Sequence, residues 1–190
     1  MNIANALPIE GWMEPHDLEW LAAHAAGAKR ILEVGSWHGR STMVLADNTE
    51  GIIFAVDTWC GSEEHHGSLP DTDKHAYRDF CDRAYEAFQR NMKPYIDSGK
   101  VIPIHMSSVE AASMFREFNR AFGIDLKFDM VFIDAAHDYD NIKADLRVWR
   151  PFVKGLFCGH DAGHAPVMQA VQEEFPHRPA NECSMWLVWL

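Results

Sequence analysis

The chain has 190 residues, of which 47% are hydrophobic and 24% are charged. These are ordinary proportions for a globular protein, and the length suits one domain with one core over residues 1–190. The 17 basic residues face 28 acidic ones, giving a formal net charge of −11. This balance argues against a nucleic-acid partner, because clustered Lys and Arg supply most of the affinity for phosphates.

No segment approaches the roughly 20 apolar residues that a membrane helix needs, and the first ten residues lack the basic and apolar regions of a leader peptide. We therefore expect a cytoplasmic protein without a membrane partner. The four cysteines are widely spaced and include no Cys-x-x-Cys pair, which predicts reduced thiols rather than a zinc cluster or a disulfide framework. They are Cys60, Cys81, Cys158 and Cys183.

Strand-like apolar runs alternate with helical stripes along the chain. This order predicts an α/β fold with a doubly wound, mainly parallel, Rossmann-like sheet and helices on both faces. A helical segment is expected within residues 1–28, because Pro15-His16-Asp17 opens an amphipathic pattern that ends at Gly27. Six strands are predicted, at residues 30–34, 52–56, 101–105, 130–133, 156–158 and 184–190.

Helices are predicted between these strands. One begins near Ser41, and another carries an apolar stripe from Tyr77 to Tyr95. A third begins at Ser107, whose spacing to Glu110 is that of a capping box. The third helix is expected to turn four side chains toward the core: Met114, Phe115, Phe118 and Phe122. Two more helices are predicted at residues 142–149 and 166–175.

Residues 61–74 hold acids, histidines, glycine and proline without apolar periodicity, which predicts a surface loop that can act as a lid. Polar residues follow or end five of the predicted strands. Ligands of such sheets lie beyond the carboxyl ends of the strands, so these side chains should converge on a ligand. They are Glu33, Asp57, Ser107, Asp134 and Asp161.

The segment from Glu33 to Ser41 reads Glu-Val-Gly-Ser-Trp-His-Gly-Arg-Ser. Its two glycines, Gly35 and Gly39, permit a tight turn and close approach of a ligand to the backbone. A nicotinamide-binding turn normally has glycine where this chain has Trp37, so a nicotinamide-dependent oxidoreductase is the less favoured alternative. Asp57, at the end of the next strand, is well placed to accept both hydroxyl hydrogens of a ribose. A nucleoside without phosphates fits these features.

The same segment resembles the first motif of class I S-adenosylmethionine-dependent methyltransferases. Residues 56–61 (Val-Asp-Thr-Trp-Cys-Gly), 132–139 (Phe-Ile-Asp-Ala-Ala-His-Asp-Tyr) and 159–161 (Gly-His-Asp) look like a bacterial subfamily related to enzymes that O-methylate sugars and other small natural products. The resemblance covers residues 17–190 and implies O-methylation of a small molecule or sugar hydroxyl. A module that binds S-adenosylmethionine without activity is a second alternative. The chain departs from the family in that only one strand is predicted after the last helix.

The resemblance also implies a role for each matching position. The first motif would surround the methionine part of the cofactor, Asp57 would hold the ribose, and Trp59 with Ser107 and Ser108 would lie around the adenine. The implied cofactor-binding residues are Glu33, Gly35, Ser36, Trp37, Gly39, Ser41, Asp57, Thr58, Trp59, Ser107, Ser108 and Asp134. Asp134 and His137 would face the transferring methyl group.

Methyl transfer requires that the acceptor proton be removed or the charge on its oxygen be stabilised. His137 or His160 can serve as the base, since histidine titrates near working pH. Alternatively, Asp134 and Asp161 can bind one hard divalent cation such as Mg²⁺, which lowers the pKa of bound hydroxyls. The expected catalytic residues are therefore His137, Asp134 and His160, and the expected metal ligands are Asp134 and Asp161. The expected partners are a small-molecule acceptor and, as an option, a second copy of the chain.

Overall fold

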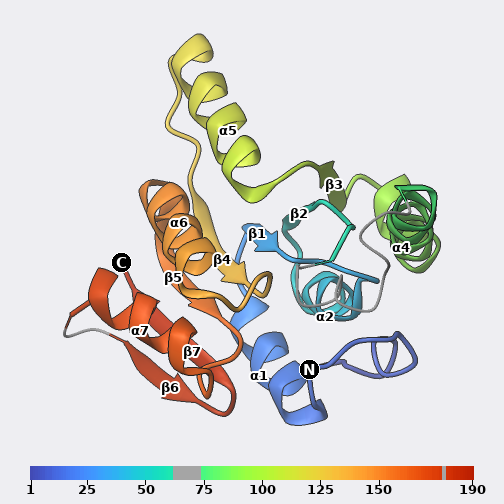
Figure 1. Ribbon diagram of the computed structural model, residues 1–190, viewed down its shortest axis with the longest axis horizontal. Helices are drawn as coiled ribbons and strands as arrows, with labels where there is room; N and C mark the ends of the chain where they lie inside the picture. The colour runs from blue at the N-terminus through green and yellow to red at the C-terminus, as the bar shows by residue number, and fades with distance from the viewer. Residues whose placement is uncertain (62–73, 177–178) are drawn as a thin grey trace.

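A mixed sheet organises the chain (Figure 1). The structure is a computed structural model that describes residues 1–61, 74–176 and 179–190. Within these residues, seven strands lie in the order β3-β2-β1-β4-β5-β7-β6. The strands are β1 (Arg30–Val34), β2 (Ile52–Asp57), β3 (Val101–His105), β4 (Phe128–Ile133), β5 (Val153–Gly159), β6 (Ala180–Glu182) and β7 (Met185–Trp189). The helices are α1 (Pro15–Ala25), α2 (Arg40–Asn48), α4 (Lys74–Asp97), α5 (Ser108–Phe122), α6 (Tyr139–Trp149), the 3-10 turn η1 (Arg150–Phe152) and α7 (Ala165–Glu174).

Strands β1 to β5 are parallel, and β1 pairs with both β2 and β4. The strand order therefore reverses between β1 and β4. In an open α/β sheet, this switch point is where the loops after two neighbouring strands separate and leave room for a ligand. The ends of β1 and β4 thus define the place to look for a site.

Two layers of helices cover the sheet, one on each face. Helices α1, α2 and α4 share a core with Ile31 of β1, whereas α5, α6 and α7 share a second core with Leu32, the next residue. Successive strand residues point to opposite faces, which is why one strand serves both cores. Both side chains are completely buried. The predicted doubly wound fold with helices on both faces is confirmed.

The carboxyl-terminal part of the sheet differs from the prediction of one strand at residues 184–190. Two antiparallel strands form a hairpin there, and β7 pairs antiparallel with β5. The missed strand β6 is only three residues long, and all three are exposed. A strand without buried residues leaves no apolar alternation to detect. The departure expected from the resemblance, a single strand after the last helix, is therefore absent.

Helix α5 begins as predicted, with the Ser107 hydroxyl and the Glu110 side chain forming a capping box. Of the side chains expected in the core, Phe115 is 5% exposed, but Met114, Phe118 and Phe122 are 39%, 42% and 68% exposed. The prediction was wrong for these three. Phe118 and Phe122 lie in the carboxyl-terminal half of α5, which projects beyond the sheet (Figure 1), whereas Met114 lies just before the buried Phe115 and is itself exposed. A helical stripe predicts a buried face only as far as the helix has a neighbour.

The prediction that all four thiols are reduced was also wrong. Cys60, just after β2, forms a disulfide with Cys81 of α4, whereas Cys158 and Cys183 are free. The two bonded cysteines are 21 residues apart in sequence, and only the packing of α4 beside the end of β2 brings them together. The loop expected at residues 61–74 lies almost wholly outside the described residues. No helix in the described part of the chain is long and apolar enough to span a bilayer.

Candidate active site

The turn after β1 is joined to both neighbouring strands at the switch point. Gly35 N donates to Val56 O (2.9 Å), and Asp134 N donates to Val34 O (2.8 Å). Gly35 has a φ of +91°, and a Cβ there would lie 1.9 Å from the Asp134 carbonyl oxygen. Glycine is therefore required here because any side chain would clash with the backbone of Asp134. This requirement holds whether or not a ligand binds.

Glu33 lies beneath this turn and is completely buried. Its Oε2 accepts hydrogen bonds from Ser36 Oγ (2.8 Å) and Thr42 Oγ1 (2.5 Å). Burial raises the pKa of Glu33 to about 7, and the hydrogen bonds from Ser41, Thr42 and Ser36 counteract part of that rise. Its Oε1 is buried and has no hydrogen-bond partner among the described residues. The turn therefore lies over a carboxylate oxygen, Oε1 of Glu33, that can still accept a hydrogen bond.

Asp57, at the end of β2, holds two loops in place. Its Oδ2 accepts a hydrogen bond from Trp37 N and its Oδ1 accepts one from Trp59 N, both at 2.7 Å. Trp37 and Trp59 have φ values of 45° and 53°, a region that residues other than glycine seldom adopt. Burial raises the pKa of Asp57, and the backbone N–H groups oppose that rise.

Two cavities meet at the ends of β1 and β4, with volumes of ≈ 490 Å³ and ≈ 330 Å³. Both are lined by Trp12, Gly35, Trp37, Asp134, Ala135 and His137. The larger cavity extends along Asp57, Thr58, Ser107, Ser108 and Asp145. The smaller cavity extends along Ser36, Arg40, Ser41, His160 and Asp161. Nine of the twelve predicted cofactor residues, and all four residues predicted for catalysis or metal binding, thus border one or both cavities.

Four of the predicted catalytic and metal-binding residues form one polar cluster. His137 Nε2 lies 2.9 Å from Asp161 Oδ2, and His160 Nδ1 lies 3.3 Å from the same oxygen and 3.6 Å from Asp134 Oδ1. Burial disfavours a charged His160, but hydrogen bonds and charges from Asp134 and Asp161 outweigh it and raise the pKa of His160 to about 11. The pKa of Asp161 is lowered, because the two histidines outweigh the effect of burial. His160 is therefore a cation at neutral pH and is poorly suited to be a base, which leaves His137.

Three predicted cofactor residues do not border either cavity in the described structure. Glu33 lies beneath the turn, Gly39 has a φ of +91° with a Cβ position 3.0 Å from Met92, and Trp59 is completely buried. The Trp59 indole packs against Phe88 and donates to Trp37 O (2.7 Å). These residues support the turn and the loop after β2, and the Trp59 indole lies in the core.

No pattern in the sequence indicates that the amino-terminal segment borders the cavities. Trp12 is 63% exposed, and its ring centroid lies 5.8 Å from that of Trp37. Arg40 Nη1 donates to the carbonyl oxygens of Ile9 (3.1 Å) and Gly11 (3.3 Å), which holds this segment against the start of α2. Residues 1–13 have no apolar periodicity, so their position depends on this long-range contact.

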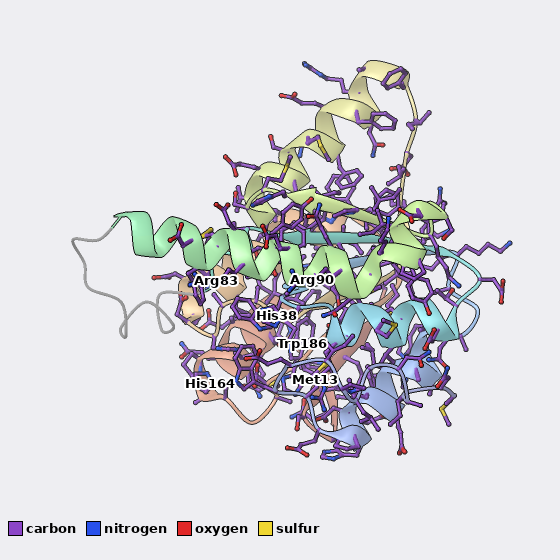
Figure 2. All side chains as sticks on the ribbon, turned by 90° about the vertical axis from the view of Figure 1, so that its right-hand side faces the viewer. Met13, His38, Arg83, Arg90, His164 and Trp186 are labelled. Atoms are coloured by element: carbon purple, nitrogen blue, oxygen red, sulfur yellow. A yellow bond between two sulfur atoms is a disulfide. The ribbon has the colours of Figure 1, made fainter. Side chains whose placement is uncertain are left out.

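Helix α4 borders the same region. His38 stacks on Trp37 with ring centroids 4.5 Å apart, and Asn91 Nδ2 of α4 donates to His38 O (2.8 Å). Figure 2 shows His38 between Arg90 of α4 and Met13 of the amino-terminal segment. Burial lowers the pKa of His38, the charge of Arg90 adds to this, and that of Glu10 opposes it. The turn after β1 is thus enclosed by α4 as well as by residues 1–13.

Comparisons with known proteins identify the fold and the family. Residues 32–162 match the family model described as "Methyltransferase domain". An O-methyltransferase from Bacillus cereus, solved in complex with SAH, is 16% identical with a TM-score of 0.61, covering 97% of this chain and 86% of that chain. An O-methyltransferase from Thermotoga maritima, described as SAM-dependent, is also 16% identical with a TM-score of 0.61, covering 98% and 70%.

A curated relative, the uncharacterized protein y4gI of Sinorhizobium fredii, is 26% identical over 149 residues. The match covers 76% of this chain but 14% of that relative, so the chain spans a small part of the relative's length. The family match, in contrast, covers more than half of this chain and includes the ends of β1, β2, β4 and β5. The chain therefore belongs to the methyltransferase domain family.

Proposed function

We propose that this chain transfers the methyl group of S-adenosylmethionine to a hydroxyl of a small molecule. The observation that carries the proposal is the pair of cavities at the switch point, which share Asp134 and His137 and lie beside Asp57 and Ser36 respectively. This arrangement provides two adjoining cavities, one for a nucleoside and one for the methyl acceptor. The fold relatives from B. cereus and T. maritima, described as O-methyltransferases, support the same reaction class.

The residues fit the cofactor part by part. Asp57 is the acid beside the larger cavity that would bind the ribose, and Ser107 and Ser108 would border the adenine. The unpaired Oε1 of Glu33 is an acceptor suited to the cofactor's ammonium group, reached directly or through a water. A cationic methionine part is compatible with this acidic environment, whereas the pyrophosphate of a nicotinamide cofactor is not. Trp37, which lines both cavities, also fills the position where glycine would admit a pyrophosphate.

The polar cluster supplies the groups that methyl transfer needs. His137 would take the proton of the acceptor hydroxyl, and Asp161, 2.9 Å from His137 Nε2, would orient the imidazole and stabilise its charged form. His160, held as a cation, would keep Asp161 ionised through its own charge. Holding the acceptor in line behind the methyl carbon would supply the rest of the acceleration.

A divalent cation is the alternative way to activate the acceptor. Asp134, His137 and Asp161 each offer one ligand atom, and these atoms lie within 4.8 Å of one another. Two carboxylates and an imidazole are suitable donors for Mg²⁺ or Mn²⁺, and a bound cation would lower the pKa of the acceptor hydroxyl. His137 cannot be both ligand and base at once. Turnover that requires Mg²⁺ and stops with chelator would favour the metal, whereas turnover unaffected by chelator would favour His137 as the base.

Calorimetric titration with S-adenosylmethionine, S-adenosylhomocysteine and reduced nicotinamide cofactor tests the proposal. We expect micromolar binding of the two adenosyl compounds and none of the nicotinamide cofactor, with or without Mg²⁺. Binding of the nicotinamide cofactor instead would replace the proposal with an oxidoreductase. Adenosyl binding without release of S-adenosylhomocysteine across a screen of phenols, sugars and small alcohols would indicate a binding module that lacks activity.

A further inference from the structure

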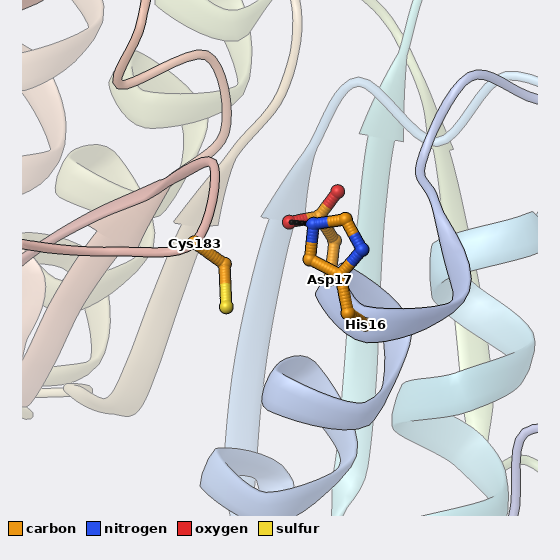
Figure 3. Close-up of side chains that lie close together, drawn as sticks. All are labelled: His16, Asp17 and Cys183. Carbon is orange, nitrogen blue, oxygen red and sulfur yellow. Dashed lines mark ion pairs between the residues drawn. The ribbon is translucent and has the colours of Figure 1, made fainter.

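A second group of metal-binding side chains lies outside the two cavities, where the start of α1 meets the turn between β6 and β7. His16, Asp17 and Cys183 each offer one ligand atom there, and the three atoms lie within 4.8 Å of one another (Figure 3). Asp17 is buried, whereas His16 and Cys183 are exposed. The cluster joins residues from the two ends of the chain, so the fold itself assembles it.

The spacing of the ligand atoms suits a small tetrahedral ion. His16 Nε2 lies 3.5 Å from Asp17 Oδ1. Two ligands at about 2.0–2.3 Å from a tetrahedral metal are about 3.3–3.7 Å apart, so this pair already has the required separation. The exposed side chains of His16 and Cys183 can adjust the other two separations by small rotations.

Asp17 is held in a fixed orientation. Ser184 N donates to its Oδ1 (3.2 Å) and Glu14 N donates to its Oδ2 (3.3 Å), while His160 Nε2 lies 3.6 Å from Oδ2. Carboxylates that bind metals are commonly hydrogen-bonded in this way by groups that do not touch the ion. The bond from Ser184 also ties the turn that carries Cys183 to the helix that carries His16.

The conformation of the hairpin turn does not require a cysteine at position 183. Cys183 and Ser184 form a two-residue hairpin turn, and Cys183 has a φ of +56°. The first position of such a turn normally takes glycine, which has no Cβ to strain. Backbone strain of this kind is often retained where a side chain has a function. Here it presents a free thiol on the side of α1.

We propose that His16, Asp17 and Cys183 bind one Zn²⁺ ion. Imidazole nitrogen, carboxylate oxygen and thiolate sulfur are the three ligand types that zinc uses in proteins, with a fourth position left for water. A thiolate and a carboxylate together balance the charge of the ion. The thiolate distinguishes this site from the group of Asp134, His137 and Asp161, which has no sulfur donor. A bound ion would link α1 to the β6–β7 hairpin.

Titration of the metal-stripped protein with Zn²⁺, with the Cys60–Cys81 disulfide left intact, tests the proposal and is followed by calorimetry and by the melting temperature. The Asp161→Asn background removes the competing donor set in the active site. We expect one Zn²⁺ per chain and a higher melting temperature. Affinity should fall at least roughly tenfold in His16→Asn and in Cys183→Gly. His24→Asn, which changes another histidine of α1, is the matched control and should bind as tightly as the parent protein.

Cys183→Gly separates loss of the ligand from loss of the fold, because glycine suits the positive φ and should leave the apo protein at least as stable. Co²⁺ provides a direct readout, since a thiolate ligand gives an intense sulfur-to-cobalt absorption band in the near ultraviolet. We expect this band in the parent protein and its loss in Cys183→Gly. Equal Zn²⁺ affinity of the parent and Cys183→Gly, or bound Co²⁺ without the band, would overturn the proposal.

Discussion

Asp161 Oδ2 lies 2.9 Å from His137 Nε2, which connects the segment after β5 to the loop after β4. The same oxygen lies 3.3 Å from His160 Nδ1, so one carboxylate oxygen faces two imidazoles. Asp161 has a φ of 61°, a conformation that costs energy for any residue but glycine. The shared oxygen and the two histidines place Asp161 at the centre of the polar cluster that we propose to be catalytic.

Asp161→Asn should lower kcat by about 10²-fold or more, because a general base loses its orienting and charge-stabilising partner. The affinity for S-adenosylhomocysteine should change little, since Asp161 borders the smaller cavity only. Steady-state kinetics with an identified acceptor and calorimetry on the same protein check both expectations. Asp125→Asn is the control, because Asp125 is an exposed acid near Lys127. A weaker affinity with normal kcat would assign Asp161 to the cofactor instead.

Much of the site could be predicted because of how parallel sheets are built. Continuous apolar runs such as Ile52–Val56 mark strands buried on both faces, and the polar residue that ends each run must then lie at the same edge of the sheet. This reasoning identified Asp57, Asp134 and Asp161 from the sequence, and all three border the cavities. The alternation of strands and helices identified the fold for the same reason.

Features that depend on contacts between distant segments could not be predicted in this way. Trp59 follows a strand end as a ligand residue would, but Tyr85 and Phe88 of α4 enclose its indole. Trp12 borders both cavities only because Arg40 holds the amino-terminal segment against α2. No local pattern in the sequence predicts either contact.

Asp57 combines a structural and a binding role, and two substitutions separate them. Asp57→Ala should weaken binding of S-adenosylhomocysteine. It should also destabilise the loops of Trp37 and Trp59, because the Asp57 carboxylate accepts hydrogen bonds from their backbone N–H groups. Asp57→Asn keeps one acceptor for a backbone N–H, so it should retain more of the melting temperature while still losing roughly tenfold or more in affinity. Calorimetry and thermal unfolding measure the two effects. Affinity equal to the parent in both variants would show that the ribose assignment is wrong.

The buried Glu33 should make the stability of the protein depend on pH. Its pKa rises from 4.5 to about 7 on folding, so the folded state binds the proton more tightly, and the free energy of unfolding should decrease as the pH rises from about 4.5 to 7. The shift corresponds to at most about 3 kcal/mol. His160 has a raised pKa of about 11, so its contribution is lost over a higher window, from about 6.5 to 11.

Glu33→Gln, which cannot ionise, should reduce the decline in stability between about pH 4.5 and 7, while the raised pKa of Asp145, about 6, keeps part of that decline, and should leave the decline above pH 7. Urea unfolding at a series of pH values measures this. Glu19→Gln, an exposed acid on α1, is the matched control and should keep the slope of the parent protein. A slope below pH 7 that persists unchanged in Glu33→Gln would contradict the assignment.

The disulfide between Cys60 and Cys81 should stabilise the fold, because it closes a loop across 21 residues and restricts the unfolded chain. Cys81→Ser should lower the free energy of unfolding by roughly 3 kcal/mol under oxidising conditions. Reductant should lower the stability of the parent protein by a similar amount and should have no further effect on Cys81→Ser. Cys183→Ser, measured with chelator present, is the control for an exposed free thiol. If reductant leaves the parent protein unchanged while Cys81→Ser is destabilised, the loss comes from packing of Cys81 against the core rather than from the covalent bond.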